Sequence, residues 1–456
     1  MHARITVRGA INQADLPTAA NEQDIKVWPV GRVFGIVELS KSLDRLRRSG
    51  GVACRRAAWN EDSQEKQAGE GIAGRFLHGR IMTVMLTLGK PGRRYEPIQI
   101  DAPFYQAGLA GYSDAAMRVV ARRHGCPYCI TEAMLDHFLI QGGKGLEHAK
   151  LYPGDHGKDA PLCGQLMGSH PADIAAGAKI LVDLGYDVVD VNLACPVKKI
   201  KKKARGGHLL SAPDEAIAIL EAVADAVGED VPLTVKLRRA YDDSPQMTSN
   251  FHRILQSVMD LGYSGATVHS RTVQQKYIGP GSWDELRQIV EHFGLRKPNE
   301  IHFTLGGSGD IWQAPDIFRM LEQTGVHWVS VARGCIGNPW FFQQARAIMQ
   351  GDLEAARSSP TIHQQRDVLL EHFQISAELH GEHQAGRMMR KFGIKFSRHH
   401  PQGGEVKKQF ISTKNLADWQ KVLDTWYAED GPGAPYESVI PDEAEYVECG
   451  TPIGAQ

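Results

Sequence analysis

The sequence contains no run approaching the roughly 18 apolar residues that a membrane-spanning helix needs, and its first residues lack the apolar core of a secretory signal peptide. Cysteine is scarce and odd in number, with seven in 456 residues, which argues against a disulfide framework and suits a reducing compartment. The formal net charge of -1 excludes a protein that is basic over its whole surface, although a local basic face stays open. We therefore expect a cytoplasmic protein with no membrane association and no evident stable protein partner.

Cysteine and histidine also fail to form a metal-binding pattern, and we predict no metal site. The pair Cys126 and Cys129, in the stretch CPYC, has the spacing of a dithiol redox motif. Such motifs follow a strand and open a helix, whose N-terminus lowers the thiol pKa. This pair follows a helical pattern and enters a strand, so the sequence argues against redox chemistry.

Both ends of the chain lack a regular pattern. Residues 1–80 are rich in Arg, Gly and Gln without sustained apolar periodicity, and we predict a poorly ordered extension. Patterned sequence begins near Met82 and Met85, and we hypothesise that the native protein starts there. Residues 429–456 are acidic and rich in Pro and Gly, which predicts a loose tail.

Residues 95–345 alternate short apolar runs with helical stretches, several of which begin with Ser or Asp and end with Gly. Eight such runs, each followed by a crossover, predict an α/β fold, an eight-stranded parallel (β/α)8 TIM barrel. An open doubly wound sheet is the alternative, because strand number alone does not close a barrel. The predicted strands are residues 98–110, 128–134, 161–168, 187–195, 232–238, 265–271, 301–308 and 328–334.

Residues 346–428 change to a purely helical pattern, which predicts a smaller all-helical C-terminal domain. A basic stretch inside it, from Arg387 to Lys414, carries eight Lys and Arg residues against one acid, Glu405. A solvated helix face is one interpretation of this stretch, and contact with an acidic partner is the other.

Polar side chains stand at the ends of the last six predicted strands, where TIM barrels carry their active sites. The runs near Gly309 and Gly334, with Arg333, have the character of a phosphate site on the seventh and eighth loops. The strand-end residues are Gln165, Cys195, Lys236, Arg238, His269, Arg271, Gly306, Gly307, Gly309, Arg333 and Gly334.

At these positions the chain resembles the tRNA-dihydrouridine synthase family over roughly residues 97–420. The element NLACP followed by lysines, together with TVKLR and TVHSRT, carries the most specific part of the resemblance. Matching elements are AGLAGYSD (107–114), TEAM (131–134), QLMGS (165–169), DVNLACPVKK (190–199), TVKLR (234–238), TVHSRT (267–272), GSGDI (307–311) and RGCIGNPW (333–340).

The resemblance implies a flavoenzyme that reduces uridines in tRNA, with FMN in the barrel, NADPH as reductant and a helical domain that holds the tRNA. It implies that Cys195 is the catalytic acid. The implied cofactor-binding residues are Gly108, Leu109, Ala110, Gln165, Lys236, His269, Ser308, Gly309, Asp310, Ala332, Arg333 and Gly334. The predicted RNA-binding residues are Lys198, Lys199, Arg205, Arg271, Arg387, Arg390, Lys391, Lys395 and Arg398.

Two places depart from the family pattern. Ala107–Gly108–Leu109 replaces the usual Ala-Pro-Met, and Ser308–Gly309–Asp310 replaces the usual Asn-Gly-Asp. Both places touch flavin through the backbone in relatives, so the surroundings of the ring are expected to differ. Neither departure removes a catalytic group.

The implied chemistry explains why a cysteine precedes a lysine-rich loop. Reducing the uracil 5,6 double bond needs hydride at carbon-6 and a proton at carbon-5, and a thiol with an ordinary pKa of about 8.5 is protonated at neutral pH. The lysines after Cys195 would lower that pKa, so we interpret them as contacts to the RNA backbone. Two alternatives stay open: a small-molecule FMN barrel like the dihydroorotate or dihydropyrimidine dehydrogenases, and a catalytically silent RNA-binding barrel.

Overall fold

A computed structural model describes residues 85–149, 159–197, 205–295 and 302–439. The predicted extension, residues 1–80, lies outside the described residues, as do the end of the predicted tail, residues 440–456, and the predicted RNA contacts Lys198 and Lys199. Among the described residues, no helix combines the length and the apolar character needed to cross a membrane.

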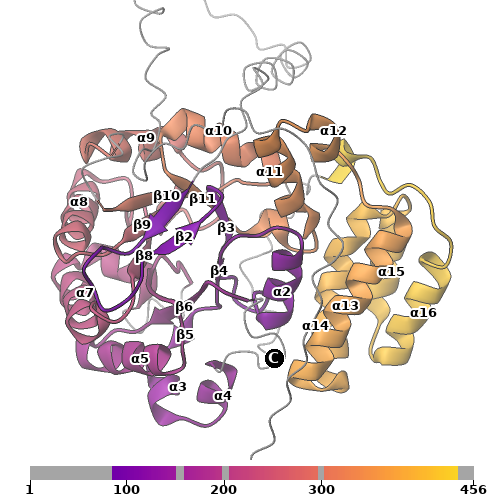
Figure 1. Cartoon of the computed structure of the whole chain (residues 1–456), viewed down its shortest axis with the longest axis horizontal. Coiled ribbons are helices and arrows are strands. Elements are labelled where there is room, and N and C mark those ends of the chain that lie inside the picture. The colour runs from indigo at the N-terminus through magenta and orange to yellow at the C-terminus, as the bar shows by residue number, and fades with distance from the viewer. Residues whose placement is uncertain (1–84, 150–158, 198–204, 296–301, 440–456) are drawn as a thin grey trace, which may run out of the picture. The chain divides into compact units, whose positions relative to one another are not determined.

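Eight parallel strands close into a barrel, which confirms the predicted fold (Figure 1). The sheet closes because β3 pairs with β11 on one side and with β4 on the other, and β4 pairs in turn with β6. The barrel strands are β3 (Phe104–Gln106), β4 (Cys129–Ile130), β6 (Leu162–Met167), β7 (Val188–Leu193), β8 (Leu233–Arg238), β9 (Gly265–His269), β10 (Thr304–Ser308) and β11 (Trp328–Val331). A short strand, β5 (Met134–Leu135), pairs with the end of β6.

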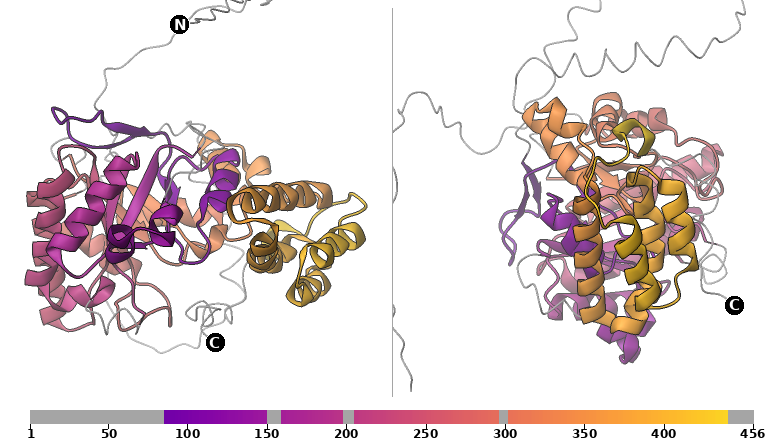
Figure 2. Two further views of the ribbon diagram at one scale, coloured as in Figure 1. Left: turned by 90° about the horizontal axis from the view of Figure 1, so that it is seen from below. Right: turned by 90° about the vertical axis from the view of Figure 1, so that its right-hand side faces the viewer.

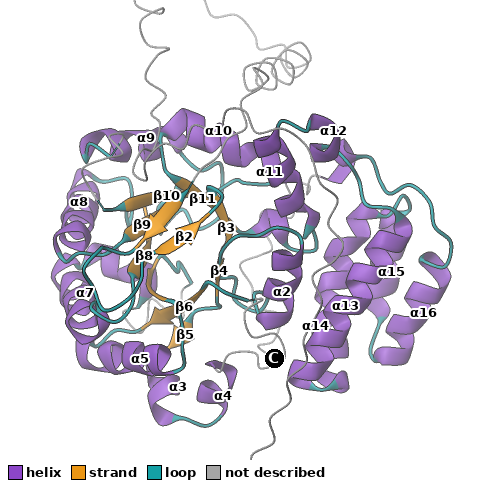
Figure 3. Cartoon of the chain, in the orientation of Figure 1, coloured by secondary structure: helices purple, strands orange, loops and turns teal. Residues whose placement is uncertain are grey.

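Helices surround the strands, as the ring of purple ribbons around the orange barrel in Figure 3 shows. Two caps predicted from the sequence are present: the side chains of Asp114 and Ser282 each accept a hydrogen bond from the first turn of a helix. Ser244 caps a further helix in the same way, several residues before the start that the sequence pattern predicts. The helices around the barrel are α2 (Ala115–Arg123), α3 (Asp136–Gln141), α4 (Lys144–Ala149), α5 (Pro171–Asp183), α7 (Pro213–Val227), α8 (Pro245–Asp260), α9 (Trp283–His292), α10 (Ala314–Thr324) and α11 (Trp340–Gln350).

The first predicted strand is wrong as a single element. Residues 98–110 contain two strands separated by the bend at Asp101–Pro103, and only the second, β3, belongs to the barrel. The first, β2 (Ile98–Ile100), forms an antiparallel hairpin with β1 (Leu86–Leu88). Proline lacks the N–H that would continue a strand ladder, which suits the bend.

This hairpin closes the amino-terminal end of the barrel. Leu88 and Ile100 are fully buried in a small core that also contains Tyr105, Tyr128 and Trp328. The ring centroids of Tyr105 and Trp328 lie 4.5 Å apart. Large side chains therefore fill this end, and an active site is left to the other end, where the strands finish.

Alternation along the strands separates an apolar outer layer from a polar interior. In β7, Val189 and Val191 are buried in the main core between strands and helices, whereas Asp190 bonds to side chains of neighbouring strands. Successive side chains of a strand point to opposite faces, so the inward positions of a barrel are free to carry polar groups.

Helices after the barrel pack against it through α2 and α11. Arg123 of α2 forms an ion pair with Glu371, and His380 Nε2 lies 3.1 Å from Asp114 Oδ2. Figure 2 shows these helices, orange to yellow, gathered at one side of the barrel. They are α12 (Leu353–Ala356), α13 (Ile362–His380), α14 (Glu382–Phe396), α15 (Gly403–Ser412) and α16 (Leu416–Trp426), and short 3-10 turns occur at η4 (Gly206–Ser211), η5 (Arg333–Cys335), η6 (Ser397–His399) and η7 (Tyr436–Val439).

The first part of the predicted tail, residues 429–439, lies within the described residues. Residues 429–439 are tied to the helices: Ile362 N donates to Gly431 O at 3.0 Å, and Ala434 N donates to His399 O at 2.7 Å. The expectation of a loose tail from residue 429 is therefore wrong for residues 429–439, because backbone hydrogen bonds to distant residues hold them. The predicted boundary at residue 345 also falls inside α11, which covers the barrel.

Candidate active site

Polar side chains of adjacent strands meet at the carboxyl end of the barrel. The register places Asn192 beside Lys236, and it places Arg238 beside His269, which in turn lies beside Ser308. All five occupy inward positions of β7 to β10. The structure thus brings Lys236, Arg238 and His269, three of the strand-end residues that the sequence singled out, together with Asn192 and Ser308.

Cys195 lies two residues beyond β7, in a turn that is held from several sides. Asn192 Oδ1 accepts hydrogen bonds from the backbone N–H groups of Ala194, at 3.0 Å, and Cys195, at 3.2 Å. Arg238 Nε donates to Ala194 O at 2.9 Å, and Gly207 N donates to Cys195 O at 3.0 Å. Burial raises the pKa of the Cys195 thiol above its ordinary value. The group is therefore a protonated thiol at neutral pH, as a proton donor must be.

Lys236 carries an ammonium group into the barrel interior. Its Nζ is enclosed and has no hydrogen-bond partner among the described residues, although part of the side chain is exposed. Burial and, to a smaller extent, neighbouring Arg238 lower the pKa of Lys236 to about 7, against the opposing effect of Asp190. Because a buried polar group without a partner costs free energy, this atom fits a ligand with a hydrogen-bond acceptor.

His269, the last residue of β9, presents a neutral imidazole. Its Nδ1 accepts a hydrogen bond from Arg271 N at 3.2 Å, which leaves the proton on Nε2. Burial lowers the pKa of His269 well below its ordinary value, and Arg238, Lys236 and Arg271 add to the effect. The ring is therefore a hydrogen-bond donor rather than a cation.

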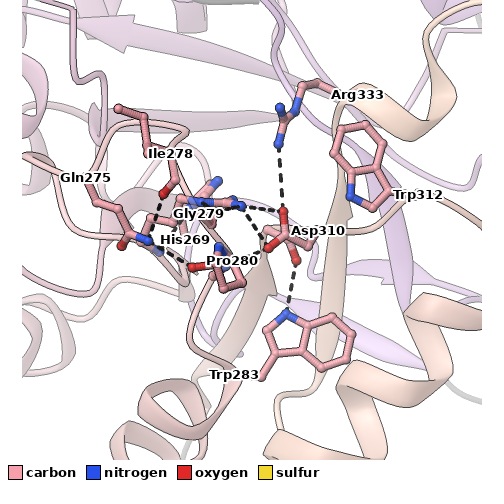
Figure 4. A network of polar contacts seen from close by, with 12 residues as sticks. His269, Gln275, Ile278, Gly279, Pro280, Trp283, Asp310, Trp312 and Arg333 are labelled. Atoms are coloured by element: carbon pink, nitrogen blue, oxygen red, sulfur yellow. Dashed lines mark hydrogen bonds and ion pairs between the residues drawn. The ribbon is translucent and has the colours of Figure 1, made fainter. Parts of the chain in front are cut away.

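Asp310 organises the loops after β9 and β10 (Figure 4). Arg271 Nη2 donates to Asp310 Oδ1 at 2.7 Å and to Oδ2 at 2.9 Å, and Gly281 N donates to Oδ2 at 2.6 Å. Arg333 lies 3.8 Å from the same carboxylate, and its guanidinium stacks 4.4 Å from the centre of the Trp312 ring. Asp310 thus joins Arg271 and Arg333, two residues that the sequence singled out.

Arg271 is placed differently from its prediction as an RNA contact. Only 1% of its surface is exposed, and its Nε donates to Gly279 O at 2.8 Å. The guanidinium is already engaged inside the protein, so this placement argues against contact with an RNA backbone.

The glycine-rich loops lie beside this network. Gly309 has a φ of +118°, a conformation that side chains with a Cβ rarely adopt, and its carbonyl accepts from Trp283 Nε1 at 3.1 Å. Its neighbour Asp310 also has a positive φ, of 57°. The other predicted cofactor positions lie at the same end of the barrel, after β3 and β11: Gly108, Leu109 and Ala110 follow β3, and Ala332, Arg333 and Gly334 follow β11.

The predicted RNA-binding side chains divide by exposure. Arg387 and Arg390 of α14 are exposed, three residues apart on one helix face. Lys391 Nζ instead lies 4.7 Å from the centre of the Tyr112 ring, and Arg398 Nη2 donates to Ile336 O at 2.6 Å. Lys395 is half-buried. The basic stretch therefore serves partly as a contact with the barrel.

Arg205 stands at the rim of the barrel mouth. Its guanidinium lies 3.4 Å from His137 Nδ1 and 3.7 Å from Asp136 Oδ1, and its Nε donates to Ser169 Oγ at 3.5 Å. This residue is partly enclosed rather than freely solvated.

The cysteine pair lies away from the mouth. Cys126 and Cys129 are buried, with their sulfur atoms 3.7 Å apart, between the end of α2 and the start of β4. Burial raises the pKa of Cys129 well above its ordinary value, which opposes thiolate chemistry. Among residues 85–149, 159–197, 205–295 and 302–439, no three His, Cys, Asp or Glu side chains are grouped to hold a metal ion.

Sequence reasoning missed Asp190, Asn192 and Thr234 as members of the site. Asp190 accepts from Gln165 Nε2 at 2.9 Å and from Thr234 Oγ1 at 2.6 Å, and Gln165 Oε1 accepts from Asn192 Nδ2 at 2.7 Å. A signal was present: an aspartate inside the buried apolar run VVDVNL is rare unless it is paired.

Comparison with known proteins shows which family the chain is similar to. A sequence model described as Dihydrouridine synthase (Dus) matches residues 105–428. The chain is 26% identical over 392 residues to a probable tRNA-dihydrouridine synthase of Mycobacterium tuberculosis, covering 80% of this chain and 96% of that protein. It is 28% identical over 331 residues to a probable tRNA-dihydrouridine synthase of Treponema pallidum, covering 72% and 94%. It is 29% identical over 296 residues to tRNA-dihydrouridine synthase B of Shewanella oneidensis, covering 65% and 86%.

Proposed function

Because the chain belongs to the dihydrouridine synthase family, we propose that it reduces the 5,6 double bond of specific uridines in tRNA to dihydrouridine. The observation that carries the proposal is the protonated Cys195 thiol in a hydrogen-bonded turn after β7, at the end of the barrel where Asn192, Lys236 and His269 face inward. The names of the relatives support tRNA as the substrate over a small pyrimidine.

The residues at the mouth fit an FMN cofactor. Lys236 Nζ lacks a partner among the described residues and would hold an acceptor edge of the ring. His269 on the neighbouring strand β9 and Gln165 on β6, two strands away, would contact the ring as well. The loops at Gly309 and Gly334, with Arg333, would hold the phosphate. When bound, FMN supplies hydride to carbon-6 of the uracil ring, with NADPH as the source of electrons.

Cys195 would complete the reduction as general acid, by giving its proton to carbon-5 on the other face of the base. Its raised pKa keeps the thiol protonated at neutral pH. The turn held by Asn192, Arg238 and Gly207 limits the positions that the sulfur can take. Proton transfer depends on such positioning because donor and acceptor must come within hydrogen-bond distance.

The tRNA would be held by basic side chains around the mouth and on α14. A uridine must leave its stack to enter a closed barrel mouth, and backbone contacts offset that cost. Arg387 and Arg390 are exposed and free to reach phosphates, whereas Lys391, Lys395 and Arg398 would support the helix against the barrel.

The Cys195→Ala substitution tests the proposal. We expect the variant to keep its fold, its FMN content and flavin reduction by NADPH, because the thiol belongs to the second half of the reaction. Reoxidation of the reduced enzyme by unmodified tRNA should slow by about 10²- to 10⁴-fold, the usual contribution of a positioned general acid. Single-turnover kinetics with pre-reduced enzyme separate the two half-reactions.

Cys126→Ala is the matched control, since Cys126 is buried away from the mouth. It should cost some stability and leave the tRNA step unchanged. A Cys195→Ala enzyme that reduces uridine at the parent rate would contradict the role of the thiol. A parent protein with no flavin and no effect on tRNA would contradict the function as a whole.

A further inference from the structure

A continuous set of hydrogen bonds leads from the barrel interior to the Cys195 turn. It begins at Asp190 and passes through the side chains of Gln165 and Asn192 to the backbone N–H of Cys195. We propose that Asp190 is a positioning residue, which sets the orientation of both amides and thereby holds the Cys195 turn. This inference rests on the proposed function for the meaning of the turn, but the contacts themselves do not.

Asp190 fixes which group donates and which accepts in each hydrogen bond of this set. Only 2% of its surface is exposed, and its two carboxylate oxygens accept from Gln165 Nε2 and Thr234 Oγ1. An ionised carboxylate accepts hydrogen bonds and donates none. Burial raises the pKa of Asp190 to about 6, so the group is predominantly ionised above that pH.

Gln165 therefore has one favourable orientation. Its NH2 group faces Asp190 at 2.9 Å, which turns its carbonyl oxygen toward Asn192 Nδ2, 2.7 Å away. The reverse orientation would direct the carbonyl oxygen at a carboxylate and the NH2 group at another NH2 group. Both contacts would be repulsive in a site that excludes water.

The orientation of Gln165 fixes that of the Asn192 amide, which bonds to the backbone of the turn. With its NH2 group donated to Gln165, its oxygen faces the N–H groups of Ala194 and Cys195. A side-chain oxygen that accepts from residues two and three positions later forms a local turn of the backbone. The polarity of Asp190 thus decides whether this turn keeps its two hydrogen bonds.

The Asp190→Asn substitution changes the polarity and preserves the volume. Its new NH2 group would face Gln165, so the Gln165 amide would rotate by about 180° to present its oxygen. The Asn192 amide would then rotate in the same way, and its NH2 group would face the N–H groups of the turn. Adding Gln165→Glu restores the original pattern, because the introduced carboxylate can accept from both neighbouring NH2 groups. The double variant therefore recovers the turn, whereas a general loss of packing would not be recovered.

The test measures alkylation of Cys195 by iodoacetamide at pH 7.5 in the full-length purified protein, with the labelled peptide quantified by mass spectrometry. We expect Asp190→Asn to label about tenfold faster than the parent, since a released turn exposes the thiol and returns its pKa toward the ordinary value. Asp190→Asn with Gln165→Glu should return to within about twofold of the parent. Thr267→Val removes another buried hydrogen bond, between the hydroxyl groups of Thr267 and Tyr105 at 2.7 Å, and should leave labelling unchanged.

Parent-like labelling of Asp190→Asn overturns the proposal, and so does a folded double variant that labels as fast as the single one. If Asp190→Asn does not fold, Asn192→Ala breaks the same set at the end next to the Cys195 turn and should give the same tenfold increase. Parent-like labelling of Asn192→Ala also overturns the proposal. Labelling requires no turnover, so a protein that fails to modify tRNA would refute the proposed function while the labelling series still decides the role of Asp190.

Discussion

The pKa of Lys236 depends on where its charged atom, Nζ, lies. Its Nζ is enclosed by the barrel and has no hydrogen-bond partner among residues 85–149, 159–197, 205–295 and 302–439. Burial lowers its pKa to about 7, so cofactor binding should raise the pKa again by supplying an acceptor. The charge of this lysine is thus coupled to the ligand it would hold.

Replacing Lys236 by alanine should remove most of the FMN that copurifies with the protein and slow tRNA reduction by at least about 100-fold, the scale of losing one preorganised electrostatic donor. Flavin absorbance and single-turnover rates measure the two effects. Lys179→Ala, at an exposed site on α5, is the control and should change neither. Full activity with normal flavin content in Lys236→Ala would show that the β8 lysine has no part in the site.

The pKa of Cys195 also predicts how the reaction rate depends on pH. Because burial raises its pKa above the ordinary value, the acid form persists to higher pH than in a free thiol, whose pKa is about 8.5. The single-turnover rate with tRNA should stay level from about pH 6.5 to 8.5 and fall about tenfold per pH unit above the thiol pKa. Cys195→Ser should be slow and lack this fall, and a decline that begins below pH 8 would indicate a lowered pKa instead.

At the scale of elements, α14 has two different faces. Its buried positions, Met389 and Phe392 among them, pack in the core, and Lys391 contacts the aromatic ring of Tyr112 on the loop after β3. Arg387 and Arg390 point to solvent. One helix therefore joins a structural contact with the barrel to a surface suited to phosphates.

Replacing both Arg387 and Arg390 by glutamine should weaken tRNA binding and reduce the slope of log Kd against log salt by about one to two, since each phosphate contact contributes somewhat under one. Lys179→Gln with Arg253→Gln removes the same charge from exposed sites on α5 and α8 and should leave the slope unchanged. Equal effects in the two double variants would mean that net charge, rather than the α14 surface, determines the affinity.

At the scale of the whole molecule, the barrel and the C-terminal helices pack so closely that their backbone atoms come near contact. Gly337, on the loop after β11, has a φ of +64°, and a Cβ there would lie 2.8 Å from the backbone of Lys395 and Phe396. His399 Nε2 lies 3.0 Å from the carbonyl oxygen of the same glycine. This loop therefore links the candidate phosphate site to α14 and η6.

Gly337→Ala should lower the free energy of unfolding by about 2–4 kcal/mol, because a strained φ adds to an overpacked contact with backbone. Gly351→Ala has a similar φ of +77° and no atom within 4 Å of the added Cβ, so it isolates the backbone term and should cost about 1–2 kcal/mol. Denaturant unfolding measures both. Equal losses would show that the contact between the loop and the helices is not tight.

The sequence by itself determined the alternation of strands and helices, the α/β class and the set of strand-end residues, whereas closure of the sheet came from the structure. These features depend on neighbours along the chain: the alternation of Val189, Asp190 and Val191 in β7, or the Ser282 cap of α9. The residue elements around Cys195, Lys236 and His269 also predicted the family. Local periodicity and short motifs are properties of contiguous residues, so they are readable without a fold.

The tertiary structure alone decided which groups meet. Asp190 and Gln165 are 25 positions apart, and Arg271 and Asp310 are 39 positions apart. No periodicity specifies such pairs, which explains why Arg271 was predicted as an RNA contact and Asp190 was overlooked. The same holds for β2, whose apolar residues suit a barrel strand equally well until the bend at Asp101–Pro103 directs them to the end of the barrel. Partners and burial depend on closure of the whole sheet, because only closure brings strands distant in sequence to hydrogen-bonding distance.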